Sequence, residues 1–130
     1  QGVTHIVDVA TLTGAIRVAL GSVGAGAFGN VKDFTRRVVD CGEKAGELYW
    51  ELPLWPELAK ANESKIADLK NSGGDAGAGS ITAALFLSRF AGDTPWVHLD
   101  IAAVAFDAEQ GTGFGVRTLV ELVRSFAPKN

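Results

Sequence analysis

Residues 5–20 read HIVDVATLTGAIRVAL, an apolar run followed directly by helix-forming residues. Residues 5–10 are short, apolar and rich in β-branched side chains, which predicts a buried strand. Residues 13–20 carry helix formers and stop at Gly21, which predicts a helix. A strand that leads directly into a helix is typical of α/β proteins.

The rest of the chain continues this alternation. Strands are predicted at 24–29 (GAGAFG), where glycines let another backbone approach closely, and at 96–103 (WVHLDIAA). Further helices are predicted over 31–44 with Asn30 as N-cap, over 56–62, over 81–90 with Ser80 as cap, and over 114–126. Residues 48–54 predict an extended segment and 71–80 a glycine-rich loop. The fold class is therefore α/β, a single domain with a mixed, mostly parallel sheet flanked by helices.

Composition and charge exclude several classes of protein. The 130 residues are 47% hydrophobic, with fifteen acids, twelve scattered bases and a net charge of -3. This balance argues against nucleic acid or a membrane surface as a partner, and no apolar run approaches the roughly 18 residues of a membrane helix. Cys41 alone cannot form an internal disulfide or a Cys-based zinc cluster. It predicts a small, buried or half-buried side chain in a reducing, cytoplasmic compartment.

The start of the chain is unusual for a complete protein. The sequence contains no Met and opens at Gln1, almost directly before an apolar run. A complete translation product begins with Met and usually keeps others in its core. We therefore expect residues 1–130 to be a piece of a longer protein.

Two glycine-rich segments imitate phosphate-binding loops. Residues 24–29 match G-x-G-x-x-G, but that fingerprint requires a strand directly before its first glycine, and residues 16–20 predict a helix. A nucleotide-binding module is therefore only a minor alternative. Residues 74–80 lack the Lys that a phosphate loop carries after Gly79. Their backbone amides remain candidates for a nest around an anion or a substrate carbonyl, with a mobile surface loop as the alternative.

Four ionisable residues lie in the two clearest strands. Asp8 and Asp100 must each find a cation, backbone amides or a metal, because an unpaired carboxylate in an apolar strand is costly. A structural ion pair or cap is the commoner outcome. His5 and His98 predict core or edge histidines rather than ligands. No H-x-x-x-H, H-E-x-x-H or G-x-S-x-G spacing occurs, so these residues alone predict no reactive centre.

Residues 8–15 (DVATLTGA) resemble the signature of the leucyl (cytosol) aminopeptidase family. The resemblance continues in order along the chain and covers essentially residues 3–126. Its further pieces are GAFGN (26–30), ELPL (51–54), ADLKN (67–71) with the glycine loop and ITAA (81–84), WVHLDIA (96–102) and GFGVR (113–117).

The resemblance implies a zinc-peptidase-like α/β/α fold and a metallo-exopeptidase. Family members release N-terminal, Leu-like residues from peptides with two zinc or manganese ions, and they form homohexamers. The metal ligands lie in a Lys/Asp-bearing segment and an N-T-D-A-E-G-R motif, both upstream of the matched region. Residues 107–111 (DAEQG) imitate that motif but follow the final strand. We therefore expect the C-terminal portion of a metalloaminopeptidase catalytic domain, with no catalytic residue and no metal ligand in this chain, and no activity alone.

What the resemblance does transfer is a substrate cradle. Positions that contact the first residue of the substrate in the family correspond to Thr11, Leu12 and Gly14, positions that line its S1 pocket to Ala102 and Ala105, and the neighbourhood of S1′ to Asn71 and Ser72. Small residues leave room for a leucyl side chain, while backbone groups fix the polar ends of the ligand. Ordinary packing is the alternative for each of these residues. At the level of function, the alternative is a non-catalytic remnant that binds peptides or a partner.

Overall fold

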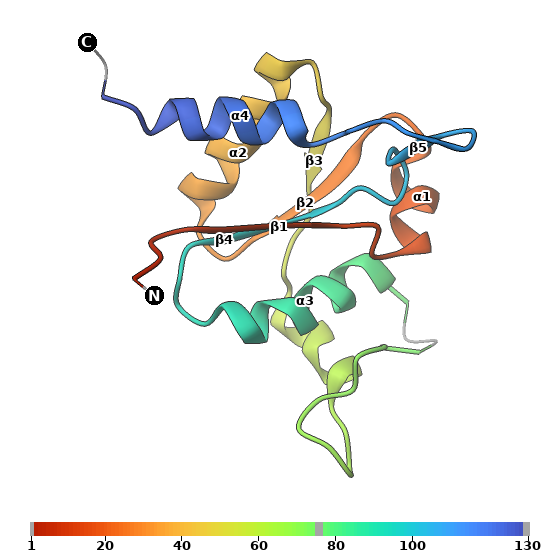
Figure 1. Ribbon diagram of the computed structural model, residues 1–130. Helices are drawn as coiled ribbons and strands as arrows, with labels where there is room; N and C mark the ends of the chain where they lie inside the picture. The colour runs from red at the N-terminus through yellow and green to blue at the C-terminus, as the bar shows by residue number, and fades with distance from the viewer. Residues whose placement is uncertain (1, 75–76, 129–130) are drawn as a thin grey trace.

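A four-stranded sheet forms the middle of the computed structural model, which describes residues 2–74 and 77–128 (Figure 1). The strands are β1 (Ile6–Ala10), β2 (Ala25–Gly29), β3 (Tyr49–Glu51) and β4 (Trp96–Asp100), in the spatial order β1-β4-β2-β3. β1 and β4 pair in parallel, as do β2 and β3, whereas β2 and β4 are antiparallel. The prediction of a mixed, mostly parallel sheet is therefore confirmed.

Helices cover both faces of this sheet. α2 (Lys32–Ala45) and α4 (Val116–Ser125) lie on one face, as Figure 1 shows above the sheet. α3 (Gly79–Ala91) covers the other face, with the 3-10 helix η1 (Pro56–Asn62) packed on α3, and α1 (Gly14–Leu20) lies beside α3. The layers are thus helix, sheet and helix. Within the part of the chain that the structure describes, no helix is both long and apolar enough to cross a membrane.

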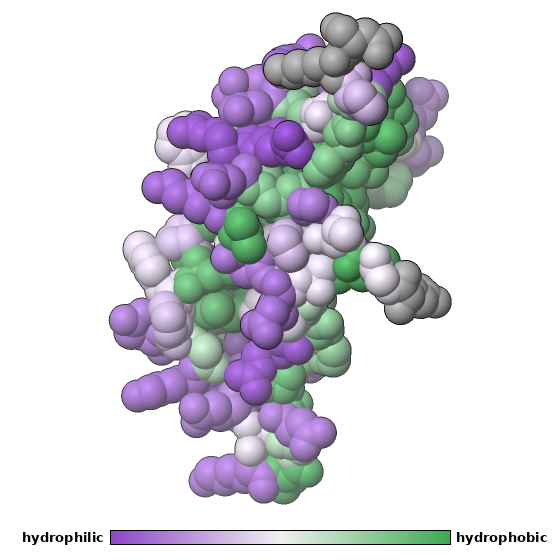
Figure 2. Space-filling view, turned by 90° about the vertical axis from the view of Figure 1, so that its left-hand side faces the viewer, coloured by the Kyte–Doolittle hydropathy of each residue, from purple (hydrophilic) through white to green (hydrophobic). Residues whose placement is uncertain are grey.

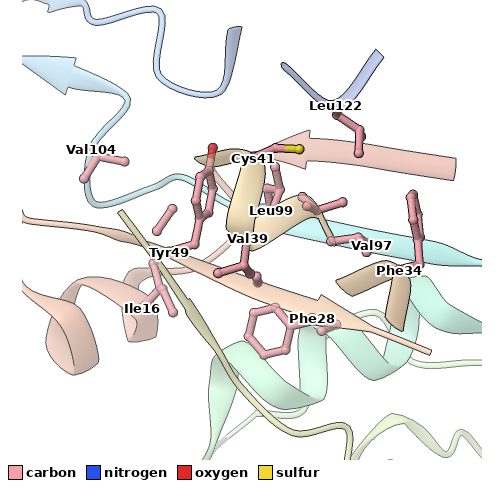
Figure 3. Packing of buried hydrophobic residues seen from close by; sticks show 14 of the residues in the cluster. Ile16, Phe28, Phe34, Val39, Cys41, Tyr49, Val97, Leu99, Val104 and Leu122 are labelled. Carbon is pink, nitrogen blue, oxygen red and sulfur yellow. The ribbon is translucent and has the colours of Figure 1, made fainter. Parts of the chain in front are cut away.

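Small residues in β2 allow the helices to approach the sheet closely. Figure 3 shows Ile16 and Phe28 on the side of α3, and Val39 and Leu122 on the opposite side. A methyl group added at Gly26 would lie 2.5 Å from Cδ1 of Ile16, so a side chain of α1 fills the space that this glycine leaves. Cys41 is 3% exposed in α2, which confirms the prediction of a buried filler.

Two predicted helix caps are wrong, because tertiary contacts use their side chains instead. Asn30 accepts a hydrogen bond from the Trp96 amide at 2.8 Å and donates to the Thr94 carbonyl at 2.9 Å, which ties the end of β2 to the start of β4. Val31 is the N-cap of α2 and makes no side-chain cap bond. Ser80 lies inside the first turn of α3, and its hydroxyl bonds across to the loop before α1.

Several predicted boundaries also move. The strand predicted over 96–103 ends at Asp100, because the carboxylate of this residue binds nearby backbone amides and residues 102–104 form a turn. The extended segment is reduced to the three residues of β3, the 56–62 helix is of the 3-10 type, and the final helix begins at Val116. An unpredicted hairpin joins β5 (Phe106–Asp107) to β6 (Gln110–Gly111).

Candidate functional site

The site begins where β1 and β4 end side by side. These strands are parallel with Ala10 opposite Asp100, so their carboxyl ends meet at one edge of the sheet, where ligands bind in open α/β sheets. Asp100 is fully buried. Its Oδ1 accepts hydrogen bonds from the amides of Leu12 at 3.0 Å, Ala102 at 3.3 Å and Thr13 at 3.4 Å. Its Oδ2 accepts from the Thr13 hydroxyl at 2.6 Å. Of the partners expected for Asp100, the structure shows backbone amides, so this carboxylate has the structural role that was expected as the commoner outcome.

The Thr13 side chain links this carboxylate to two helices. Its hydroxyl oxygen accepts a hydrogen bond from the Ile16 amide at 3.2 Å, which caps the start of α1. The same oxygen lies 2.9 Å from the Ser80 hydroxyl on α3. The loop before α1 is therefore fixed both to β4 and to α3.

A cleft of about 350 Å³ opens between this loop and the segment before α3. It is lined by backbone and small side chains from the loop and start of α1, from residues 71–74, and from the first turns of α3: Leu12, Thr13, Gly14, Ala15, Asn71, Ser72, Gly73, Gly74, Gly79, Thr82 and Ala83. Gly14 has open space where a side chain would project. The cleft thus offers backbone polar groups and room for an apolar side chain.

Four of the predicted cradle residues meet in this cleft, namely Leu12, Gly14, Asn71 and Ser72. The other three are outside its lining. Thr11 is exposed in the loop between β1 and α1. Ala102 lies behind the cleft, where its amide shares Oδ1 of Asp100 with Leu12. Ala105 is half-buried in the following turn.

Sequence reasoning missed Thr13 and Ser80 as parts of the site. The available signal for Thr13 was its position directly before a helix, which is typical of an N-cap. The sequence carries no signal for the contact between the two hydroxyl groups, because they lie 67 residues apart.

A second carboxylate cluster lies further along β1, around the half-buried Asp8. Asp8 accepts a hydrogen bond from Trp96 Nε1 at 2.6 Å, and its other oxygen lies 2.5 Å from Nδ1 of His98. His98 is fully buried and stacks on Phe28, which confirms the prediction of a core histidine. His5 is an edge histidine, with its ring 4.6 Å from that of Phe34.

The described residues do not fit a metal centre. Residues 2–74 and 77–128 contain no group of three or more His, Cys, Asp or Glu side chains that could hold a metal ion. The carboxylates of Asp8 and Asp100 already accept hydrogen bonds through both oxygens. Asp107 and Glu109 lie exposed on the β5–β6 hairpin.

The two glycine motifs have different outcomes. Residues 25–29 form the buried strand β2 rather than a turn into a helix, so the nucleotide fingerprint lacks its structural context. The amide nest proposed over 74–80 includes residues 75 and 76, which lie outside the described residues.

Comparisons with known proteins agree with one another. A profile described as the catalytic domain of the cytosol aminopeptidase family matches residues 1–120. The chain is 48% identical to a probable cytosol aminopeptidase of Koribacter versatilis, over 96% of this chain and 26% of that protein. It is 51% identical to one from Desulforapulum autotrophicum, over 95% of this chain and 25% of that protein. A mutant of tomato leucine aminopeptidase superposes with a TM-score of 0.88 at 45% identity, covering 94% of this chain and 25% of its own. The chain therefore spans about a quarter of the length of these relatives.

Proposed function

The chain belongs to the cytosol aminopeptidase family, and from this we infer that it forms a substrate-binding wall of an enzyme that hydrolyses the N-terminal peptide bond of peptides. The observation that carries this proposal is the cleft that brings Leu12 and Gly14 together with Asn71 and Ser72. These residues come from two segments nearly sixty positions apart, and each matches a cradle position implied by the family resemblance.

The proposed substrate is a peptide with a Leu-like first residue. Gly14 leaves open space, and its small neighbours Ala15 and Ala83 add no bulk to the cleft. Because the amides of Leu12 and Thr13 donate to Asp100, the 11–14 loop offers a fixed backbone against which the polar ends of the substrate can lie. An apolar side chain gains free energy by leaving water for such a space.

The remaining parts of the proposal come from the family. We propose that the whole enzyme uses two divalent metal ions, manganese or zinc, held by residues outside this chain. We also propose a cytoplasmic homohexamer, and the exposed apolar side chains of α4 support assembly with other copies. No step of the reaction is assigned to the residues described here; their part is to bind and orient the peptide.

The pocket is tested by filling it. Gly14 has no positive φ and nothing within 4 Å of an added Cβ, so Gly14→Val should fold normally. In wild-type protein, we expect leucyl-leucine to shift the NMR signals of the amides at 11–14 and 71–74. The valine should weaken this binding about tenfold, since it occupies the space meant for the substrate side chain. Gly111→Val, on the β5–β6 hairpin, is the matched control. Unshifted amides in the wild-type protein would refute the pocket.

The chain by itself is expected to lack hydrolytic activity. We expect no release of p-nitroaniline from leucyl-p-nitroanilide when Mn²⁺ or Zn²⁺ is added, because no described cluster of side chains suits a metal ion. The measurement requires a pure sample and a blank without protein. Turnover above that blank would contradict the assignment of the reactive centre to other segments.

A further inference from the structure

We propose that Asp100, acting through the hydroxyl of Thr13, is the positioning residue that sets the two walls of the cleft relative to each other. This inference rests on the proposed function of the cleft, but it concerns a residue that does not line it. Asp100 is fully buried behind the 11–14 loop and reaches the cleft only through its hydrogen bonds.

The carboxylate of Asp100 joins the segment that follows β1 to the segment that follows β4. Oδ1 of Asp100 takes the amide of Leu12 from one segment and that of Ala102 from the other. The Ile101 amide also donates to the Ala10 carbonyl at 2.9 Å, so the two chain segments leave the sheet together. Within the described residues, no Lys or Arg pairs with Asp100. A buried carboxylate requires hydrogen-bond donors, and here the two chain segments provide them. The position of the loop is therefore dictated by the carboxylate.

The Thr13 hydroxyl takes part in three hydrogen bonds, and their directions follow from its single hydrogen atom. A hydroxyl group has one hydrogen to donate and two lone pairs to accept with. Its hydrogen goes to Oδ2 of Asp100, because an ionised carboxylate only accepts. One lone pair takes the Ile16 amide. The remaining lone pair faces Ser80, so the Ser80 hydroxyl must be the donor of that bond. The carboxylate thus fixes the direction of every bond in the chain from Asp100 to Ser80.

The ordered hydrogen bonds also reach the opposite wall of the cleft, at the start of α3. Ser80 belongs to the first turn of α3, where Gly79 and Thr82 line the cleft. Thr82 donates to the Gly79 carbonyl at 3.1 Å, and a methyl group at Gly73 would lie only 3.1 Å from the Thr82 hydroxyl. The 71–74 segment is therefore packed tightly on α3. A change in the Thr13–Ser80 bond is transmitted to this segment by direct contact.

The direction of these bonds makes Asp100→Asn an informative variant. The Asn oxygen can still accept the backbone amides at the Oδ1 position. At the Oδ2 position, however, an NH₂ group needs an acceptor, and the Thr13 hydroxyl can accept from it only by turning its own hydrogen toward Ser80. The variant therefore keeps the shape of the side chain, removes the negative charge that holds the 11–14 loop, and reverses the Thr13–Ser80 bond. Thr13→Val has no hydroxyl and breaks the link between the walls.

The experiment compares wild-type protein with Asp100→Asn, Thr13→Val and Thr13→Ser. The first readout is amide hydrogen exchange at Leu12, Ala102 and the first hydrogen-bonded amides of α3, those of Ile81 and Thr82, with the β2 amides as an internal reference. The second is the affinity for leucyl-leucine, and the melting temperature is recorded for each variant. Thr35→Val is the matched control, since Thr35 is also fully buried and its hydroxyl bonds only within α2, on the opposite face of the sheet.

We expect Thr13→Val to speed exchange at Leu12, Ile81 and Thr82 about tenfold, with β2 unchanged, and to weaken peptide binding by a similar factor. Asp100→Asn should have a smaller effect on both, because it keeps a reversed Thr13–Ser80 bond. Thr13→Ser should restore both, because it retains the hydroxyl. Thr35→Val should lower the melting temperature without changing the affinity. The proposal is overturned if exchange rises only uniformly, or if affinity follows the melting temperature in Thr35→Val as well. If the wild-type protein fails to bind the peptide, the proposed function fails, while the exchange measurements still decide whether the network holds the walls.

Discussion

Tyr49, Thr118 and Glu47 form a buried chain of hydrogen bonds between β3 and the start of α4. The Tyr49 hydroxyl donates to Oγ1 of Thr118 at 3.0 Å, and Thr118 donates to Oε2 of Glu47 at 2.6 Å. The Thr118 amide donates to the same carboxylate oxygen at 3.0 Å. Glu47 therefore caps the first turn of α4 from outside the helix, which is a favourable place for a negative charge.

Because Tyr49 is buried among these groups, we expect the free energy of unfolding to fall at alkaline pH. Burial raises the pKa of Tyr49 to about 12, and the negative charge of Glu47 adds to this effect. The folded protein then holds the phenol proton more tightly than the unfolded chain. Its contribution to the free energy of unfolding, up to about 3 kcal/mol, is complete below pH 10 and is lost as the pH rises to about 12.

The test uses the fact that the chain has a single Tyr. Tyrosinate absorbance should therefore report Tyr49 alone, with a midpoint near pH 12 in folded protein. Urea unfolding between pH 10 and 12 should show a steeper loss of stability for wild-type protein than for Tyr49→Phe. A midpoint near 10, or equal slopes, would contradict the buried position of this hydroxyl.

At the residue scale, the sequence could predict that a buried polar side chain requires hydrogen bonds, but not which residues provide them. An acid in an apolar strand requires donors, and both Asp8 and Asp100 have them. For Asp8 these are Trp96 and His98, which lie 88 and 90 positions away. For Asp100 they include Leu12 and Thr13, which lie 88 and 87 positions away. Such distances in sequence are closed only by the order of strands in the sheet. The contact between Thr13 and Ser80 was missed for the same reason.

At the element scale, α2 contains a glycine that its helix propensity would disfavour. Alanine at an interior helix glycine normally stabilises by about 1 kcal/mol. At Gly42, however, an added methyl group would overlap the ring of Tyr49 and lie 3.0 Å from the Glu47 carbonyl oxygen. We expect Gly42→Ala to lower the free energy of unfolding by about 1–3 kcal/mol, measured by urea denaturation. Asp40→Ala, at an exposed position of the same helix, should change it little. An ordinary stabilisation by Gly42→Ala would show that α2 can move away from β3.

The elements with a clear period were predictable, and their ends were not. The alternation of apolar strands and helices indicated β1, β2, β4 and all four α-helices. The end of β4 was misplaced, because Asp100 draws the chain into a turn instead of letting the apolar run 101–104 continue the strand. Asn30 is of a residue type that commonly caps helices, but its side chain joins the end of β2 to the start of β4. The β5–β6 hairpin has strands of two residues, too short for any alternation to show.

At the scale of the whole molecule, α4 leaves an apolar face uncovered. Val116, Val120 and Val123 are 60%, 44% and 72% exposed and line a groove of about 510 Å³ with Leu119 and Arg124. Figure 2 shows hydrophobic surface gathered in the upper part of the molecule, near the C-terminal end where α4 lies. β1 is an edge strand of the sheet, since among the described strands it pairs only with β4. Surfaces of this kind favour association.

We therefore expect the isolated chain to associate in solution. Light scattering should give a mean mass above the 13.6 kDa of one chain, rising with concentration. Val120→Lys should shift the mass toward the monomer, because a charge in the middle of the groove is costly to bury. Val18→Lys, at a 90% exposed position on α1, should have no such effect. A monodisperse wild-type monomer would contradict this expectation.

The parallel pairing of β1 with β4 also has a consequence for the order of folding. Asp8 and His98 are 90 positions apart, so β1 leaves the ribosome long before its partner strand exists. Helices α1, α2 and α3 involve mainly nearby residues and can form in the meantime, whereas pairing over such a separation is slow. The cleft is closed behind by Asp100, so it is completed only when this late strand is added. A nascent chain that stalls before Asp100 would carry most of the helices but no place for a peptide.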